Sequence, residues 1–105
     1  MLEIGAWHPS WGDVHLGPAN ALTALELLGG GTLLPVHWST FNLGMHAWDE
    51  PAETLFELAR RAGTRIVTPV LGEATEPGVQ VQPVAWYCMK HVPSRARESM
   101  FGVRA

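Results

Sequence analysis

The sequence predicts a small α/β domain in which three short strands alternate with two helices. Apolar runs of strand length occur at residues 2–6, 32–36 and 65–70. The two segments between them carry apolar residues at helical spacing, and each of these segments ends in glycine. This order is typical of a layered fold with crossover helices.

The first strand, residues 2–6, leads into an aromatic loop at residues 7–15. Pro18 suits the first turn of a helix, and Gly17 before it is a weak cap. Three glycines at 29–31 favour a stop, because glycine accepts the left-handed conformation of a helix C-cap. The apolar stripe of this helix is expected to comprise Ala21, Leu22, Ala24, Leu25 and Leu28.

The second strand, residues 32–36, is followed by a loop at residues 37–48. Either Asp49 or Glu50 is expected to cap the second helix, with Pro51 in its first turn. Acidic residues there suit the helix dipole. The residues expected to be buried are Leu55, Leu58, Ala59 and Ala62, and those expected in solvent are Glu53, Glu57, Arg60 and Arg61.

Gly63 ends the second helix, and the third strand, residues 65–70, is interrupted by a proline. An edge strand over residues 79–82 is expected from their alternating pattern, limited by the proline that follows. We therefore expect a folded unit over residues 1–78 and an edge strand with a C-terminal tail over residues 79–105.

Composition narrows the classes of function. Apolar residues make up 47% and charged residues 16%, as in a globular chain. A net charge of −3 disfavours nucleic-acid binding through phosphate neutralisation. The single cysteine, Cys88, excludes an internal disulfide and suits a reducing cytoplasm. No signal peptide is recognised, and no apolar run is long enough for a membrane span. We expect a cytoplasmic protein.

Histidines at the presumed carboxyl ends of the strands are the candidate functional groups. His37 directly follows the second strand, where ligands and catalytic groups collect in α/β proteins. It is a candidate metal ligand or general base, or else a structural histidine. His15 precedes the first helix and is placed for proton transfer at the same rim, unless it is a solvent-exposed loop residue. The loop aromatics expected to line an apolar pocket, or to pack the loops onto the core, are Trp7, Trp11, Trp38, Phe41 and Trp48.

Four segments together resemble one family. They are Ile-Gly-Ala-Trp-His-Pro-Ser-Trp at 4–11, His15 with the proline-started helix, Val-His-Trp-Ser-Thr-Phe at 36–41, and Asp-Glu-Pro at 49–51. This pattern, over residues 4–77, is similar to the C-terminal part of metallo-β-lactamase-fold hydrolases of the N-acylphosphatidylethanolamine phospholipase D and ascorbate-phosphate lactonase type.

The resemblance implies the C-terminal half of an αββα sandwich. It implies that His37 is the last metal-binding histidine and that His15 has a catalytic or substrate-side role. The implied cofactor is a divalent metal, with zinc first and manganese or iron as alternatives. The implied substrate is a phosphodiester, a lactone or a related small-molecule or lipid-like ester.

Two departures from the family pattern change the expectation for this chain alone. Ser39 replaces the usual glycine, and the His-x-His-x-Asp-His motif with its bridging aspartate is absent. Catalytic zinc needs about three protein ligands, which His37 alone does not provide. We therefore expect no hydrolysis and no retained metal by this chain alone. The expected partner is the missing N-terminal half or another copy of the chain.

Two alternatives remain open. In the first alternative, the chain is a non-catalytic fragment that acts as an accessory or self-associating module. Its uncovered apolar surface then binds a partner. A weaker alternative is a module that binds metal through histidines of two chains, drawn from His8, His15, His37 and His46.

Overall fold

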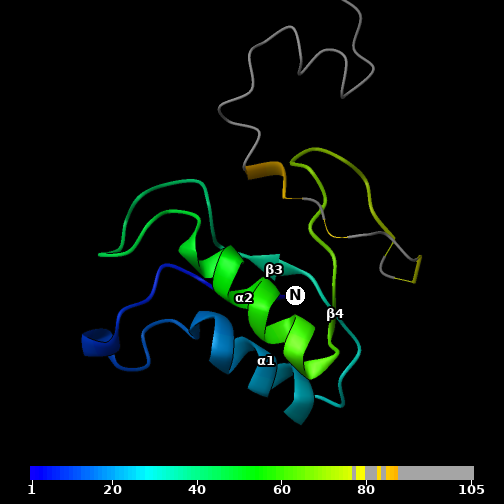
Figure 1. Cartoon of the computed structure of the whole chain (residues 1–105), viewed down its shortest axis with the longest axis horizontal. Helices are drawn as coiled ribbons and strands as arrows, with labels where there is room; N and C mark the ends of the chain where they lie inside the picture. Colours follow the sequence, from blue (N-terminus) through cyan, green and yellow to red (C-terminus); the bar gives the residue numbers. More distant parts are fainter. Residues whose placement is uncertain (77, 80–82, 84, 88–105) are drawn as a thin grey trace, which may run out of the picture.

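The computed structural model describes residues 1–76, 78–79, 83 and 85–87 of the chain. These residues form a small mixed α/β domain with two helices and short parallel strands, as predicted (Figure 1). The elements in chain order are β1 (Leu2–Glu3), a 3₁₀ turn η1 (Pro9–Trp11), α1 (Gly17–Leu27), β2 (Thr32–Leu33), β3 (Pro35–Val36), α2 (Glu50–Ala62) and β4 (Arg65–Ile66).

The strands are shorter than the sequence predicts. The run at 32–36 is divided into β2, which pairs in parallel with β4, and β3, which pairs in parallel with β1. Backbone bonds continue the two ladders by one residue, from Ile4 N to the Val36 carbonyl (3.1 Å) and from Val67 N to the Leu33 carbonyl (2.9 Å). Pro69 has no amide hydrogen to extend the last strand. The run at 32–36 is therefore central, with a neighbour on each side.

Helix α1 lies where the glycine and proline signals place it, and a backbone bond from Gly30 N to the Leu25 carbonyl (2.8 Å) closes its end. The expectation that Leu28 belongs to the buried stripe is wrong, because its side chain is 74% exposed. The helix ends at Leu27, so Leu28 no longer follows the face that Ala21 buries.

Helix α2 begins at Glu50 and ends at Ala62, and Gly63 after it has a φ of 67°, the left-handed C-cap that the sequence predicts. Asp49 occupies the N-cap position but makes no capping hydrogen bond with its side chain. Leu55 and Ala59 are buried as expected, whereas Ala62 is exposed. Ala62 is the last residue of the helix and is followed by the exposed Gly63.

One hydrophobic core joins the helices and strands. Helices α1 and α2 lie side by side and pack against the strands (Figure 1). The buried residues of this core are Ile4, Ala21, Leu33, Leu55, Ala59 and Ile66. Tyr87 is also buried, stacks near Phe56 of α2, and donates a hydrogen bond to Glu53 Oε1 at 2.5 Å.

Most of the expected edge strand, at positions 80–82, lies outside the described residues. Among the described residues, no helix is long and apolar enough to cross a membrane.

Candidate functional site

Three side chains meet at the carboxyl ends of β1 and β3. The parallel register sets Glu3 opposite Val36, so the Glu3 carboxylate lies beside the next residue, His37. His15 Nδ1 lies 3.0 Å from Glu3 Oε2, and His37 Nδ1 lies 3.9 Å from the same oxygen. One potential metal-ligating atom from each residue lies within 4.8 Å of the other two. We call Glu3, His15 and His37 the carboxylate–histidine cluster.

The backbone directs His37 into this cluster. His37 has a φ of 62°, a left-handed conformation that is uncommon for residues other than glycine. Such strain concentrates at functional sites when the surrounding structure holds it. Its Nδ1 donates a hydrogen bond to the Gly5 carbonyl, which leaves Nε2 with a free lone pair. The side chain is 53% exposed, so a ligand can reach it.

Gly5 allows the end of β1 to approach the start of α2. A Cβ atom at Gly5 would lie 3.0 Å from Pro51 Cγ and 3.4 Å from the His37 carbonyl oxygen. The absence of a side chain at Gly5 therefore lets its carbonyl oxygen reach the His37 ring.

The Glu3 carboxylate is held in its charged form. Burial raises the pKa of Glu3, but the hydrogen bond from the Leu16 amide and the nearby His15 and His37 outweigh it, so the pKa lies below its usual value. Leu16 N lies 3.2 Å from Oε1. Because Leu16 directly precedes α1, this bond fixes the helix start to β1. The cluster therefore presents an anionic oxygen and two imidazoles.

His15 and His37 face each other, with ring centroids 4.9 Å apart. The His15 side chain is 29% exposed. A histidine that donates a hydrogen bond from one ring nitrogen to a carboxylate keeps the other nitrogen available as a base or as a metal ligand. The two histidines singled out in the sequence thus share one site.

A pocket of about 350 Å³ adjoins His37, which contributes to its wall. Of the five aromatic residues predicted to line a pocket, Trp38, Phe41 and Trp48 do so. Trp7 and Trp11 do not line it. Trp7 stacks on His46 with 5.9 Å between ring centroids, and Trp11 belongs to η1, 6.1 Å from the His8 ring.

Several residues of the site were missed in the sequence. Glu3 joins the cluster, and His46 lines the pocket. Glu3 is the single charged residue in the apolar run at 2–6, and this position could have marked it as a site residue. His8 accepts a hydrogen bond from the Ser10 amide and stands apart from the cluster.

The chain is similar in sequence to part of longer proteins. The chain is 36% identical over 90 residues to proteins of Mycobacterium tuberculosis and Mycobacterium bovis, each described as uncharacterized. The match covers 83% of this chain and 24% of each relative. The chain therefore spans about a quarter of the length of the curated relatives it matches. No protein-family model and no solved structure matches it.

Proposed function

We propose that this chain is the C-terminal portion of a metal-dependent hydrolase that acts on a phosphodiester, a lactone or a related ester. The carboxylate–histidine cluster beside an apolar pocket is the observation that carries this proposal. The family resemblance of residues 4–77 supports the same reading, with the domain as half of a metallo-β-lactamase sandwich.

The chemistry of the cluster fits a divalent transition metal. Two imidazoles and one carboxylate are a ligand set found in catalytic zinc sites. Tetrahedral zinc, with ligands at about 2.0–2.2 Å, holds neighbouring ligand atoms roughly 3.3–3.6 Å apart. In the cluster, one potential ligand atom of each residue lies within 4.8 Å of the other two. A bound metal would draw the three ligand atoms closer together than this.

Each residue has a role in this proposal. A bound divalent metal supplies Lewis-acid polarisation of an ester and lowers the pKa of water. His37, oriented through the Gly5 carbonyl, is the proposed ligand. Glu3 supplies the negative charge that favours a cation. His15 either completes the ligand set or, held by Glu3, transfers a proton to or from the substrate.

The two roles of His15 differ in measurable ways. As a ligand, His15 is needed for metal affinity, so His15→Gln weakens zinc binding by tenfold or more. As an acid–base group, His15 leaves zinc affinity nearly unchanged when it is replaced. Zinc titration of His15→Gln therefore assigns the role without an activity assay.

The catalytic unit is proposed to be longer than this chain. The matched relatives are about four times as long as the segment they share with it. In our proposal the further metal ligands come from such an additional segment, or from another copy of the chain. We expect the 105-residue chain alone to show no turnover.

One observation favours the non-catalytic alternative, in which the chain is an interaction module. Phe41, Leu43 and Met45, all in the loop at 37–48, are 72%, 69% and 83% exposed. Contiguous exposed apolar residues mark contact surfaces. Replacing Phe41 and Leu43 with serine is expected to abolish any concentration-dependent self-association seen by analytical ultracentrifugation, and not zinc binding.

The hydrolase proposal is tested on one of the whole mycobacterial relatives. The purified protein is assayed against a phosphodiester, a lactone and a carboxylic ester, with metal and after chelation. We expect hydrolysis of at least one class that chelation abolishes and added metal restores. No hydrolysis of any class, or hydrolysis that chelation leaves intact, contradicts the proposal.

A further inference from the structure

The pocket beside His37 has a mainly apolar wall built from three parts of the chain. It is formed by Gly5 and Ala6, which follow β1, by the loop at 37–48 and by the first turn of α2. Its apolar members are Ala6, Trp38, Phe41, Leu43, Trp48 and Pro51. We call it the aromatic pocket. Aromatic rings favour other rings through offset and edge-to-face contacts.

The volume of the aromatic pocket limits what it can hold. An apolar cavity of about 150 Å³ holds one benzene molecule. At about 350 Å³, the aromatic pocket is near the small end of ligand sites in proteins. One or two fused rings match this volume, and a long flexible acyl chain would lose more conformational freedom on entering it.

One polar residue of the aromatic pocket, His37, also belongs to the cluster. His37 contributes to both, so a ring in the pocket sets its substituent next to the histidine pair. His46 is already used, since its Nε2 accepts a hydrogen bond from the Trp7 amide and its Nδ1 donates to the Ala47 carbonyl. Ser39 and Thr40 also line the pocket, and their hydroxyls donate to the Trp48 and Trp38 carbonyls at 3.5 and 3.4 Å. His37 is therefore the polar side chain that the pocket shares with the cluster, and protonation of its Nε2 would make it a donor to an anionic or ester group.

The exposure of Phe41 is also informative. Its side chain lines the pocket and yet is 72% exposed, which is unusual for phenylalanine. A ring bound in the pocket would cover part of this surface. Leu43, 69% exposed, lies on the same wall.

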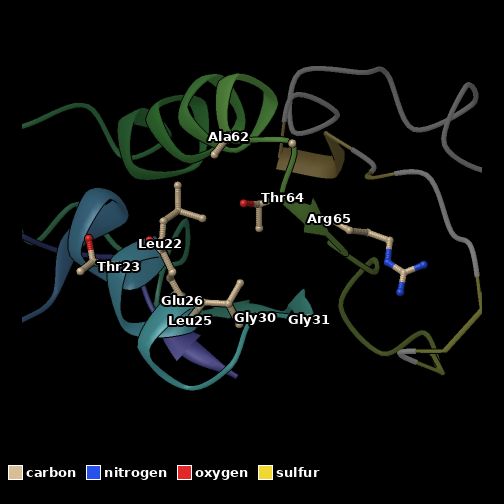
Figure 2. Close-up of a pocket in the computed structure, with 10 residues that line it drawn as sticks. Leu22, Thr23, Leu25, Glu26, Gly30, Gly31, Ala62, Thr64 and Arg65 are labelled. Atoms are coloured by element: carbon tan, nitrogen blue, oxygen red, sulfur yellow. The ribbon is translucent and has the colours of Figure 1, made fainter.

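A larger hollow at the other end of the strands provides a comparison (Figure 2). It has about 550 Å³ and lies between the C-terminal ends of α1 and α2, where Glu26 and Arg65 contribute to its wall. Among the residues that the structure describes, no aromatic side chain lines it. Its composition does not favour a ring.

We propose that the aromatic pocket binds a compact aromatic group of one or two fused rings, whose ester or acidic substituent faces His37. This inference rests on the proposed function for the nature of the substituent, whereas the binding of the ring itself needs neither metal nor catalysis.

The test uses the full chain in a chelating buffer, with 1-naphthoate as the aromatic probe and decanoate as the acyl probe. The indole signals of Trp38 and Trp48 are followed in ¹H–¹⁵N spectra during each titration. We expect saturable shifts with 1-naphthoate, at an affinity at least tenfold greater than that for decanoate.

Variants localise the binding. Phe41→Ala removes an exposed ring, so the fold should survive, and we expect about fivefold weaker binding of 1-naphthoate. Leu71→Ala, which removes a side chain that is 74% exposed outside the pocket, should leave the affinity unchanged. His37→Asn should reduce the preference for 1-naphthoate over neutral naphthalene-1-methanol.

Three results would overturn the inference: no saturable binding of 1-naphthoate, tighter binding of decanoate, or equal losses in Phe41→Ala and Leu71→Ala. Because the titrations contain chelator, they are independent of the hydrolase proposal. Zinc binding without 1-naphthoate binding overturns the pocket inference alone. Binding of 1-naphthoate by the chain, with no metal-dependent hydrolysis by the longer relatives, overturns the proposed function alone.

Discussion

Oε2 of Glu3 lies 3.0 Å from Nδ1 of His15, and this contact joins β1 to the loop that begins α1. The other oxygen of the same carboxylate accepts the Leu16 amide. One side chain therefore fixes the helix start and orients an imidazole that the sequence had singled out. His37 enters the same site because its strand pairs with β1.

Glu3→Gln is expected to change how stability depends on pH. The pKa of Glu3 is lowered in the folded chain. Its carboxylate therefore stabilises the fold above the unfolded-state pKa of about 4.5, and this contribution is lost as the pH falls through the lower folded-state pKa. The difference in unfolding free energy between the wild type and Glu3→Gln should be largest near neutral pH and smallest near pH 3.

Urea unfolding at several pH values measures this difference. Glu73 is exposed and lies outside the carboxylate–histidine cluster. Glu73→Gln is therefore the matched control. A difference for Glu3→Gln that is the same at pH 7 and pH 3 would show that the carboxylate is not stabilised by the two histidines.

Gly5→Ala is expected to destabilise the fold by about 1–3 kcal/mol, because the added methyl group meets Pro51 at 3.0 Å. The same substitution at Gly78, where a Cβ would meet nothing within 4 Å, is the control. Thermal unfolding of both variants checks the prediction. Equal midpoints for Gly5→Ala and Gly78→Ala would refute the close approach of β1 to α2.

Ser39→Gly is expected to stabilise the fold by about 1 kcal/mol. Ser39 has a φ of 56°, a conformation that glycine adopts without the steric cost of a side chain. The lost hydrogen bond from Ser39 Oγ to the Trp48 carbonyl, at 3.5 Å, offsets part of the gain. Calorimetry should show a higher midpoint for Ser39→Gly than for the wild type. Ser10→Gly, whose φ is not positive, should show no increase.

His46→Phe is expected to loosen the contact between the loops at 7–15 and 37–48. Phenylalanine keeps an aromatic ring near Trp7 but cannot accept the hydrogen bond from the Trp7 amide, which measures 3.2 Å. A net loss of about 1 kcal/mol should speed exchange of that amide roughly fivefold. His8→Phe is the control, and equal exchange rates in the two variants would contradict this role of His46.

The sequence predicted both helices well because their stop signals are local. Gly63 and the glycines at 29–31 end the helices through the left-handed conformation, and this preference needs no tertiary context. The strand ends were predicted less well. They depend on which neighbour each residue meets, as where the run at 32–36 divides its pairing between β1 and β4.

The candidate site was predicted in part. His15 and His37 were chosen because both lie at the presumed carboxyl ends of the strands, and the structure brings them together. Glu3 was missed because its role depends on the register with β3, which the sequence does not specify. The expectation that this chain alone retains no metal rested on counting His37 as its one ligand, and with Glu3 and His15 we now predict the opposite.

The most direct test of this account is zinc titration of the full chain and its variants by isothermal calorimetry. Glu3→Gln keeps the shape of the side chain, and His37→Asn places at this position a residue that tolerates its left-handed backbone. His8→Gln is the histidine control. We predict one zinc ion per chain, with affinity reduced at least tenfold in Glu3→Gln and His37→Asn and unchanged in His8→Gln. No saturable binding, or equal affinity in all variants, would contradict a metal site at the carboxylate–histidine cluster.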